Sequence, residues 1–165
     1  MIDSDKKEIR VGIADAKIVQ PPNDIATIGL GSCVGILLYD TEKKTTALIH
    51  IMLPDSSTFR EITNPYKFAD LAIPLVLKEL EEMGTRKRHL IAKIAGGAAM
   101  FKFSEQSINS DIGERNIIAV KKALANENIK IVAEDVGGSK GRSMFAYSDT
   151  GKVMIKVVGV GTIEI

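Results

Sequence analysis

The sequence predicts an α+β fold, a layered α/β sandwich of mostly antiparallel, hairpin-linked strands with two main helices. Two observations support this class: predicted strands outnumber predicted helices, and many of the strands are separated only by short turn sequences. These features disfavour a doubly wound parallel sheet. The chain of 165 residues shows no repeat, linker or low-complexity segment. We therefore expect a single domain over 1–165, with residues 1–7 as a loose polar tail.

Four strands are expected in the first third of the chain, because each run is rich in β-branched and apolar residues. They are Glu8–Val19, Ile25–Leu30, Val34–Tyr39 and Thr45–Leu53. The turn sequence Pro21-Pro22-Asn23-Asp24 separates the first two strands. The polar residues 40–44 join the last two strands as a hairpin, and residues 54–63 are predicted to form a loop.

Two helices and four further strands follow. Asn64 is a suitable N-cap for the first helix, with Pro65 at its first position and Gly84 at its end. A capping box from Asp111 to Glu114 opens the second helix, which runs to about residue 126. The predicted strands are His89–Ala95, Ile129–Val136, Ser143–Ser148 and Lys152–Val158, the last two forming a hairpin around Asp149-Thr150-Gly151.

Composition excludes several classes of protein. The net charge of +1 provides no basic field for nucleic acid. The single cysteine permits no internal disulfide, which favours the reducing cytoplasm. No stretch approaches the roughly 20 apolar residues of a membrane span, so direct membrane insertion is not expected. One cysteine and two distant histidines form no ligand cluster, so neither a metal nor another cofactor is expected.

The spacing of Cys33 and His50 suggests a nucleophile and its base. The two residues are 17 positions apart, on either side of the predicted hairpin. A turn centred between Thr41 and Glu42 would place them directly opposite each other, with Cβ atoms about 4.5–5.5 Å apart. A slip of one residue would put them on opposite faces. The turn contains no Asn-Gly or Asp-Gly pair, so the residues leave this register open.

Such a pair could attack a carbonyl group. Only the thiolate is a strong nucleophile, and a neighbouring imidazole can accept the thiol proton and return it to a leaving group. The small residues Gly31 and Ser32 would let backbone N–H groups reach an oxyanion. Thr27 could hold the imidazole in its working tautomer. The alternative is that Cys33 is a small buried core residue and His50 a hydrogen-bonded core histidine.

Five segments, in this order along the chain, resemble the chemoreceptor glutamine deamidase family, CheD. They are Ile25–Val34 (IATIGLGSCV), Ala47–Pro54 (ALIHIMLP), Gly96–Phe101 (GGAAMF), Ile112–Asn116 (IGERN) and Gly137–Arg142 (GGSKGR). The resemblance covers about residues 8–161, and its specificity lies in the joint order and spacing of the segments. One departure is Thr45-Thr46, where glycine or another small residue is expected.

This resemblance implies a function and a fold. Such proteins hydrolyse particular glutamine side chains of methyl-accepting chemoreceptors to glutamate and ammonia through a cysteine thioester, and some also hydrolyse glutamyl methyl esters. It implies that Cys33 is the nucleophile, His50 the general base and Thr27 the group that orients it. It further implies a sandwich similar to the catalytic domains of deamidating toxins. The implied partners are the cytoplasmic helices of chemoreceptors and the chemotaxis phosphatase CheC.

Three other residues are weaker candidates. Arg142 follows a glycine-rich loop and could contact an acidic substrate helix. Phe101 or Phe103 could be exposed and contribute to the surface that binds the phosphatase.

Two other functions remain open at this point. The chain could be a non-catalytic binding regulator of a phosphatase or receptor, or a thiol hydrolase that encloses a small molecule in a deep pocket.

Overall fold

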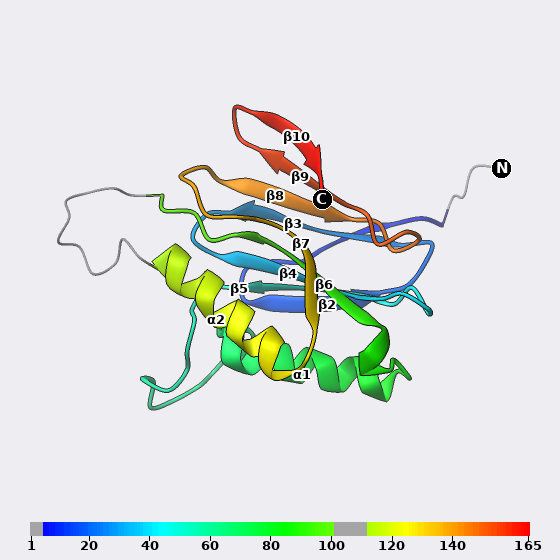
Figure 1. Ribbon diagram of the computed structural model, residues 1–165, viewed down its shortest axis with the longest axis horizontal. Helices are drawn as coiled ribbons and strands as arrows, with labels where there is room; N and C mark the ends of the chain where they lie inside the picture. Colours follow the sequence, from blue (N-terminus) through cyan, green and yellow to red (C-terminus); the bar gives the residue numbers. More distant parts are fainter. Residues whose placement is uncertain (1–4, 101–111) are drawn as a thin grey trace.

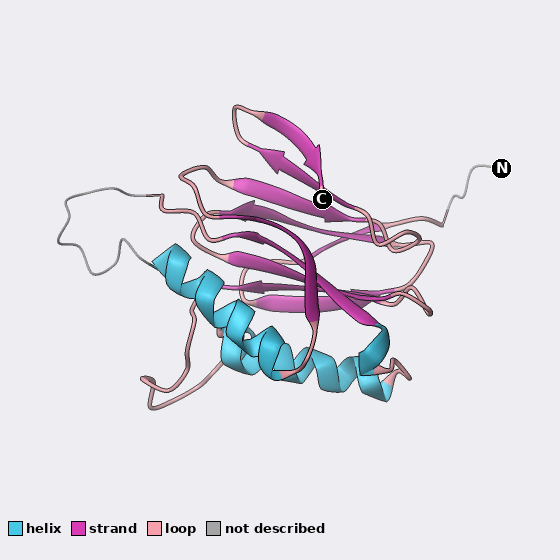
Figure 2. Cartoon of the chain, in the orientation of Figure 1, coloured by secondary structure: helices cyan, strands magenta, loops and turns pink. Residues whose placement is uncertain are grey.

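The chain folds into three stacked layers in the computed structural model, which describes residues 5–100 and 112–165 (Figure 1). Two five-stranded sheets pack face to face, and two α-helices cover the outer face of one sheet (Figure 2). This arrangement confirms the predicted layered α+β fold. None of the helices within those ranges is both long enough and apolar enough to span a bilayer.

Sheet A combines strands from both ends of the chain in the order β1-β3-β8-β9-β10. Its strands are β1 (Glu8–Arg10), β3 (Asp24–Leu30), β8 (Arg142–Ala146), β9 (Val153–Val157) and β10 (Gly161–Glu164). β1 runs parallel to β3, and the other neighbours in this sheet are antiparallel. The predicted hairpin after Ala146 is confirmed as β8–β9. β10 was not predicted, because its four residues are all exposed and form no clear apolar pattern.

Sheet B is the central layer, with the order β2-β5-β4-β6-β7. Its strands are β2 (Asp15–Val19), β5 (Thr46–Ile51), β4 (Val34–Asp40), β6 (Leu90–Gly96) and β7 (Lys130–Val136). Only β6 and β7 run parallel, and a helix lies between them in the sequence, as a parallel connection requires. β4 is buried on both faces, which explains its nearly pure apolar sequence.

The helices α1 (Ala69–Glu82) and α2 (Ile112–Asn126) pack on sheet B, and short 3₁₀ turns precede α1 and β6 at η1 (Pro65–Lys67) and η2 (Lys87–His89). Alternating side chains of sheet B therefore enter two different cores. The core between sheet B and the helices includes Ile36, Leu38, Ile49, Ile51, Val76, Leu80 and Val120. The core between the sheets includes Ile25, Leu30, Leu37, Leu48, Met144 and Ile155, with Cys33 packed against it.

The single strand predicted for Glu8–Val19 is wrong, because the structure divides it between the two sheets. β1 lies in sheet A and β2 in sheet B. Between them Ala14 adopts a left-handed backbone with φ of 56°, a conformation that interrupts a strand. The amide nitrogen of Asn64 donates to the Ala14 carbonyl and holds this turn (2.9 Å). The β-branched residues on both sides gave no sign of the break.

The predicted start of the first helix is also corrected. Asn64 does act as an N-cap, but it caps η1, where its Oδ1 accepts from the Tyr66 N–H (3.0 Å). Phe68 then returns to an extended backbone, and α1 begins one residue later. The reason is tertiary, since the N–H of Leu53 bonds to the Lys67 carbonyl and draws this segment to the end of β5. The second helix, α2, ends at Asn126 as predicted.

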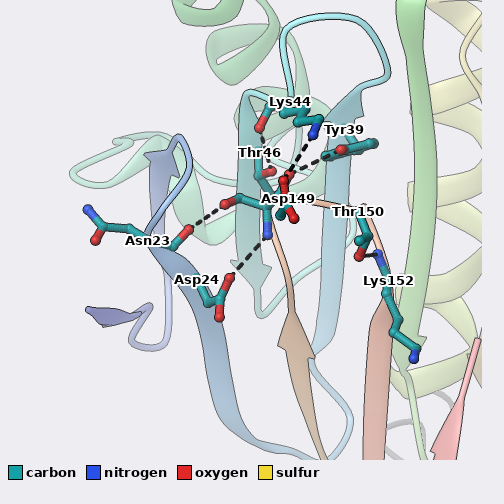
Figure 3. Close-up of polar contacts among 9 residues, drawn as sticks. Asn23, Asp24, Tyr39, Lys44, Thr46, Asp149, Thr150 and Lys152 are labelled. Carbon is teal, nitrogen blue, oxygen red and sulfur yellow. Dashed lines mark hydrogen bonds and ion pairs between the residues drawn. The ribbon is translucent and has the colours of Figure 1, made fainter. Parts of the chain in front are cut away.

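A polar cluster joins the two sheets at the carboxyl end of β4 (Figure 3). The Tyr39 hydroxyl of sheet B donates to the carbonyl of Ser148, in the turn between β8 and β9 (3.0 Å). The Ser148 N–H donates to Asp24 of β3 (3.2 Å), and Lys44 pairs with Asp149 (2.9 Å). Cys33 lies just before the opposite end of β4. The cluster therefore closes the sandwich at the end away from the candidate nucleophile.

Candidate active site

The β4–β5 hairpin brings Cys33 and His50 to the same end and the same face of sheet B, but with a different register from the one considered above. The observed pairs are Val34 with Ile51 and Gly35 with His50. The turn is longer at its carboxyl side, because Asp40 bonds through its backbone to Lys44 and Thr45. The pairing is shifted by two residues from the one considered, and because side chains alternate along a strand, Cys33 and His50 remain on the same face of the sheet.

This register changes the expected distance between the two side chains. Cys33 is placed diagonally from His50 rather than directly opposite, and diagonal neighbours in a ladder are about 7–8 Å apart at the backbone. A spacing of this kind is still within reach of an imidazole. The directly opposed arrangement is therefore corrected, while the two residues remain neighbours.

His50 lies in the middle layer of the protein and is completely buried. Its neighbours Ile49 and Ile51 belong to the core on the helix side. Because side chains alternate along a strand, the imidazole points the other way, toward sheet A. There its Nδ1 lies 2.7 Å from Oγ1 of Thr27, in β3. The predicted histidine and threonine are thus in direct contact.

The hydrogen bonds around Thr27 determine which ring nitrogen of His50 carries the proton. The Thr27 hydroxyl has one proton, which it donates to the carbonyl oxygen of Val11 (2.7 Å). Its contact with Nδ1 must then be a bond that it accepts. Nδ1 is consequently protonated, and Nε2 has a free lone pair. This is the tautomer that a general base needs at Nε2.

Burial also determines the charge of His50. It lowers the pKa of the imidazole from 6.5 to about 4, because an apolar environment disfavours the charged form. The ring is therefore neutral at pH 7. Its Nε2 is buried and has no hydrogen-bond partner in residues 5–100 and 112–165. Nε2 is therefore unprotonated and free to accept a proton at pH 7, and the lowered pKa makes it a weaker base than an exposed imidazole.

Cys33 is partly accessible, in the bend between β3 and β4. Burial raises the pKa of its thiol, and the nearby N–H of the same residue partly offsets this increase. The structure shows no hydrogen bond between the sulfur and His50 within the described ranges. At pH 7 both groups are neutral in the resting protein. For the sulfur to act as a nucleophile, its proton would have to be transferred during the attack rather than beforehand.

The loop that carries Cys33 is held through three consecutive carbonyl groups. A trans peptide is planar, with its C=O and N–H pointing in opposite directions. Each bonded carbonyl therefore fixes the direction of the N–H group in the same peptide, which belongs to Ser32 for the Gly31 carbonyl and to Cys33 for the Ser32 carbonyl. The bonds are Ala98 N–H to Gly31 O (2.8 Å), Asn116 Nδ2 to Ser32 O (2.9 Å) and Gly97 N–H to Cys33 O (2.8 Å).

Gly35, which pairs with His50, allows sheet A to pack closely against sheet B at this point. A Cβ atom at this position would lie 3.1 Å from a Leu30 methyl group and 3.1 Å from the Met144 sulfur. It would also lie 3.5 Å from the Thr27 methyl group. A glycine in a central strand here permits close approach of sheet A. The approach brings Thr27 within hydrogen-bonding distance of the imidazole.

The three weaker candidates, Arg142, Phe101 and Phe103, take no part in the contact between Thr27 and His50 that the structure describes. Arg142 is 5% exposed, and its guanidinium bonds to backbone carbonyls and to the carboxylate of Asp135, with a 2.8 Å bond to the Asp135 carbonyl. It thus holds the loop between β7 and β8. Phe101 and Phe103 fall in the segment 101–111, outside the described residues.

Sequence reasoning missed Asn116, whose side chain extends from α2 and bonds to the loop that carries Cys33. A signal was present in the sequence. Asn116, Val120 and Leu124 are spaced four residues apart and lie on one helix face, and all three are fully buried. Asparagine is a poor helix former, so one on an apolar helix face calls for a specific contact.

Comparisons with known proteins agree on one family. Residues 52–157 match the family model described as CheD chemotactic sensory transduction. A Clostridium botulinum protein (strain Eklund 17B) named "Probable chemoreceptor glutamine deamidase CheD" is 60% identical over 158 residues, covering 96% of this chain and 98% of that protein. A protein of the same name from Clostridium novyi is 55% identical over 156 residues, covering 94% and 96%.

Among solved structures, the Bacillus licheniformis hypothetical protein YfiH is 12% identical, with a TM-score of 0.45 over 76% of this chain and 50% of its own. That likeness is too distant to carry an argument. The matches to curated relatives span nearly the full chain and include the segments that carry Thr27, Cys33 and His50. By its sequence and over nearly its whole length, the chain belongs to the CheD family.

Proposed function

We propose that this protein is a chemoreceptor glutamine deamidase, which hydrolyses glutamine side chains on receptor helices in the cytoplasm. The names of its relatives supply the reaction and the substrate. The observation that carries the proposal is the hydrogen-bonded chain from Val11 O through Thr27 to His50 Nδ1. It leaves Nε2 as a proton acceptor beside the loop that presents the only cysteine.

The reaction begins when the Cys33 sulfur attacks the carbon of the glutamine amide. The thiol proton passes to Nε2 of His50, and the carbonyl oxygen becomes an oxyanion. The N–H groups of Ser32 and Cys33 stabilise this oxyanion, a contribution that is about 2.7–4 kcal/mol per donor in enzymes of this type. The imidazolium then protonates the leaving nitrogen, ammonia departs, and a thioester remains on Cys33.

Water completes the reaction. Nε2 of His50, again neutral, removes a proton from a water molecule that attacks the thioester carbon. The carbon–sulfur bond breaks, the sulfur regains its proton, and the substrate leaves as glutamate. The same thioester would form from a glutamyl methyl ester with loss of methanol, so the site is chemically suited to both substrates.

The low pKa of His50 argues against a thiolate–imidazolium pair in the resting protein. A preformed thiolate–imidazolium pair would require a charged ring inside the sandwich, which burial opposes. A neutral base instead becomes charged only as the oxyanion forms, so opposite charges appear together. The neighbouring Thr27 oxygen, which accepts from Nδ1–H, then stabilises the imidazolium.

The test is to incubate the protein with a chemoreceptor cytoplasmic fragment, measure ammonia and locate glutamate formation by mass spectrometry. Cys33→Ala should abolish both signals. Thr27→Ser, which keeps the hydroxyl, is the matched control and should remain active. Conversion that persists in Cys33→Ala would refute the proposed nucleophile.

The phosphatase CheC is proposed as a second partner, and the same variants separate catalysis from binding. Cys33→Ala should retain binding to the receptor fragment and to the phosphatase, measured by calorimetry, because it removes only the sulfur. If the wild-type protein binds both partners but releases no ammonia, the chain is a binding regulator rather than an enzyme.

A further inference from the structure

Asn116 is positioned between the two segments that carry the proposed nucleophile and base. Its Nδ2 donates to the carbonyl of Ser32, directly before Cys33, at 2.9 Å. The same nitrogen donates to the carbonyl of Met52, two residues after His50, also at 2.9 Å. One amide group of α2 thus connects the end of β5 to the loop before β4.

The orientation of this amide is determined by its partners. Both partners are carbonyl oxygens, which only accept, so the NH₂ group of Asn116 must face them. Both amide protons are therefore used. The opposite atom, Oδ1, is buried and has no partner in the part of the chain that the structure describes. The side chain is thus held through its two donors alone.

The bond to Ser32 acts on a group that the reaction needs. The Ser32 carbonyl and the Cys33 N–H belong to the same planar peptide. Fixing the carbonyl therefore fixes the direction of that N–H, one of the two oxyanion donors proposed above. Within the described residues the two hydrogen bonds of the Asn116 side chain go to the carbonyls of Ser32 and Met52, so its effect on the oxyanion would pass through this peptide.

The fold accommodates a very close approach of α2 to make this contact. A Cβ atom at Gly113, one turn before Asn116, would lie 2.5 Å from the Ala98 carbonyl oxygen. A Cβ atom at Gly97 would lie 2.4 Å from the Ile117 side chain. Both positions are glycine, so the first turn of α2 packs directly against the segment that bonds to Gly31 and Cys33.

From these contacts we propose that Asn116 is a positioning residue for the deamidation reaction. It orients the Cys33 N–H toward the oxyanion and holds the Cys33 loop in a fixed position relative to the end of β5, which carries His50. This inference rests on the proposed function. It predicts a change in the rate of the chemical step, with little change in substrate binding, because the affected N–H acts on the charge that develops in the transition state.

The test compares Asn116→Ala with Val120→Ala, which removes a buried side chain one turn further along α2 and away from the loop. Both variants should lower the melting temperature. Ammonia release from the receptor fragment should show kcat lowered about 30- to 100-fold in Asn116→Ala, somewhat less than the loss of a direct oxyanion donor. Its KM should stay within about threefold, and Val120→Ala should keep kcat within about threefold.

A second variant, Asn116→Asp, keeps the volume and removes both amide donors. Its kcat relative to the wild type should be higher at pH 5.5 than at pH 8, because a protonated carboxyl can donate to one of the two carbonyls. If Asn116→Ala does not fold, this pH profile decides the question. The inference is overturned if the kcat of Asn116→Asp relative to the wild type is the same at both pH values. It is also overturned if Asn116→Ala folds and keeps the wild-type kcat, or if Val120→Ala loses as much kcat as Asn116→Ala. Inactive wild-type protein would instead refute the proposed function itself.

Discussion

Mild acid should destabilise this protein through His50. Burial lowers the pKa of the imidazole from 6.5 to about 4 in the folded state. Between these two values the unfolded chain binds a proton at this position and the folded protein does not. The free energy of unfolding therefore rises with pH across this window. The stability associated with the neutral ring is fully present above about pH 6.5 and is lost as the pH falls toward 4.

The magnitude follows from the two pKa values. Each pKa unit corresponds to about 1.4 kcal/mol, so the full effect is about 3 kcal/mol. Between pH 7 and pH 5 the expected loss from His50 is about 2 kcal/mol. Urea unfolding at the two pH values measures it, and His50→Gln is the comparison. Carboxylate titrations are shared by both proteins and cancel in the difference.

The comparison of the wild type with His50→Gln can contradict this reasoning. If His50→Gln loses as much stability between pH 7 and pH 5 as the wild type, His50 is not held neutral by burial. The pKa of the imidazole would then lie near its usual value of 6.5, and burial would not account for the neutral ring. A direct titration of the imidazole by NMR gives the same information and should show a midpoint well below 6.

Three further outcomes are expected. Thr27→Val should lower kcat for ammonia release about 100-fold, because Nδ1 of the imidazole loses its acceptor, while Thr27→Ser should stay within about threefold of the wild type. Tyr39→Phe removes the donor to the Ser148 carbonyl and should reduce the free energy of unfolding in urea by about 1 kcal/mol, with unchanged activity. Gly113→Ala should cost about 1–3 kcal/mol by the same measurement and also lower kcat, because the new Cβ would push α2 away from the nucleophile loop.

The fold could be predicted where apolar patterns and turn signals agree. β4, β6, β7 and α2 differ from their predicted bounds by only one or two residues. Failures occurred where a distant contact overrides the local pattern. The break at Ala14 follows from the pairing of β1 with β3, and the early 3₁₀ turn after Asn64 follows from the bond of Leu53 to Lys67. Neither contact is visible in the local sequence.

The site was predicted only in part, for related reasons. Residue type and spacing suggested Cys33 and His50 as partners on one hairpin, and the resemblance to the CheD family decided between this interpretation and a buried core pair. The register was left open by the sequence, and the observed one differs by two residues from the register considered, because the longer turn is stabilised by the backbone of Asp40 rather than by a recognisable turn pair. Asn116 was missed because its partner Ser32 is 84 residues away, and hydrogen bonds at such separations leave no periodic trace.

The hydroxyl that holds the imidazole comes from sheet A, whereas the imidazole comes from sheet B and the thiol from the bend that leads directly into β4 of that sheet. A folding intermediate with only sheet B and its helices formed would already hold Cys33 and His50 together. It would lack the acceptor for Nδ1–H, so the ring could turn over or change tautomer. Under the proposed mechanism, such an intermediate would hold the nucleophile and the base without the hydroxyl that orients the base, so ammonia release would require both sheets to be docked.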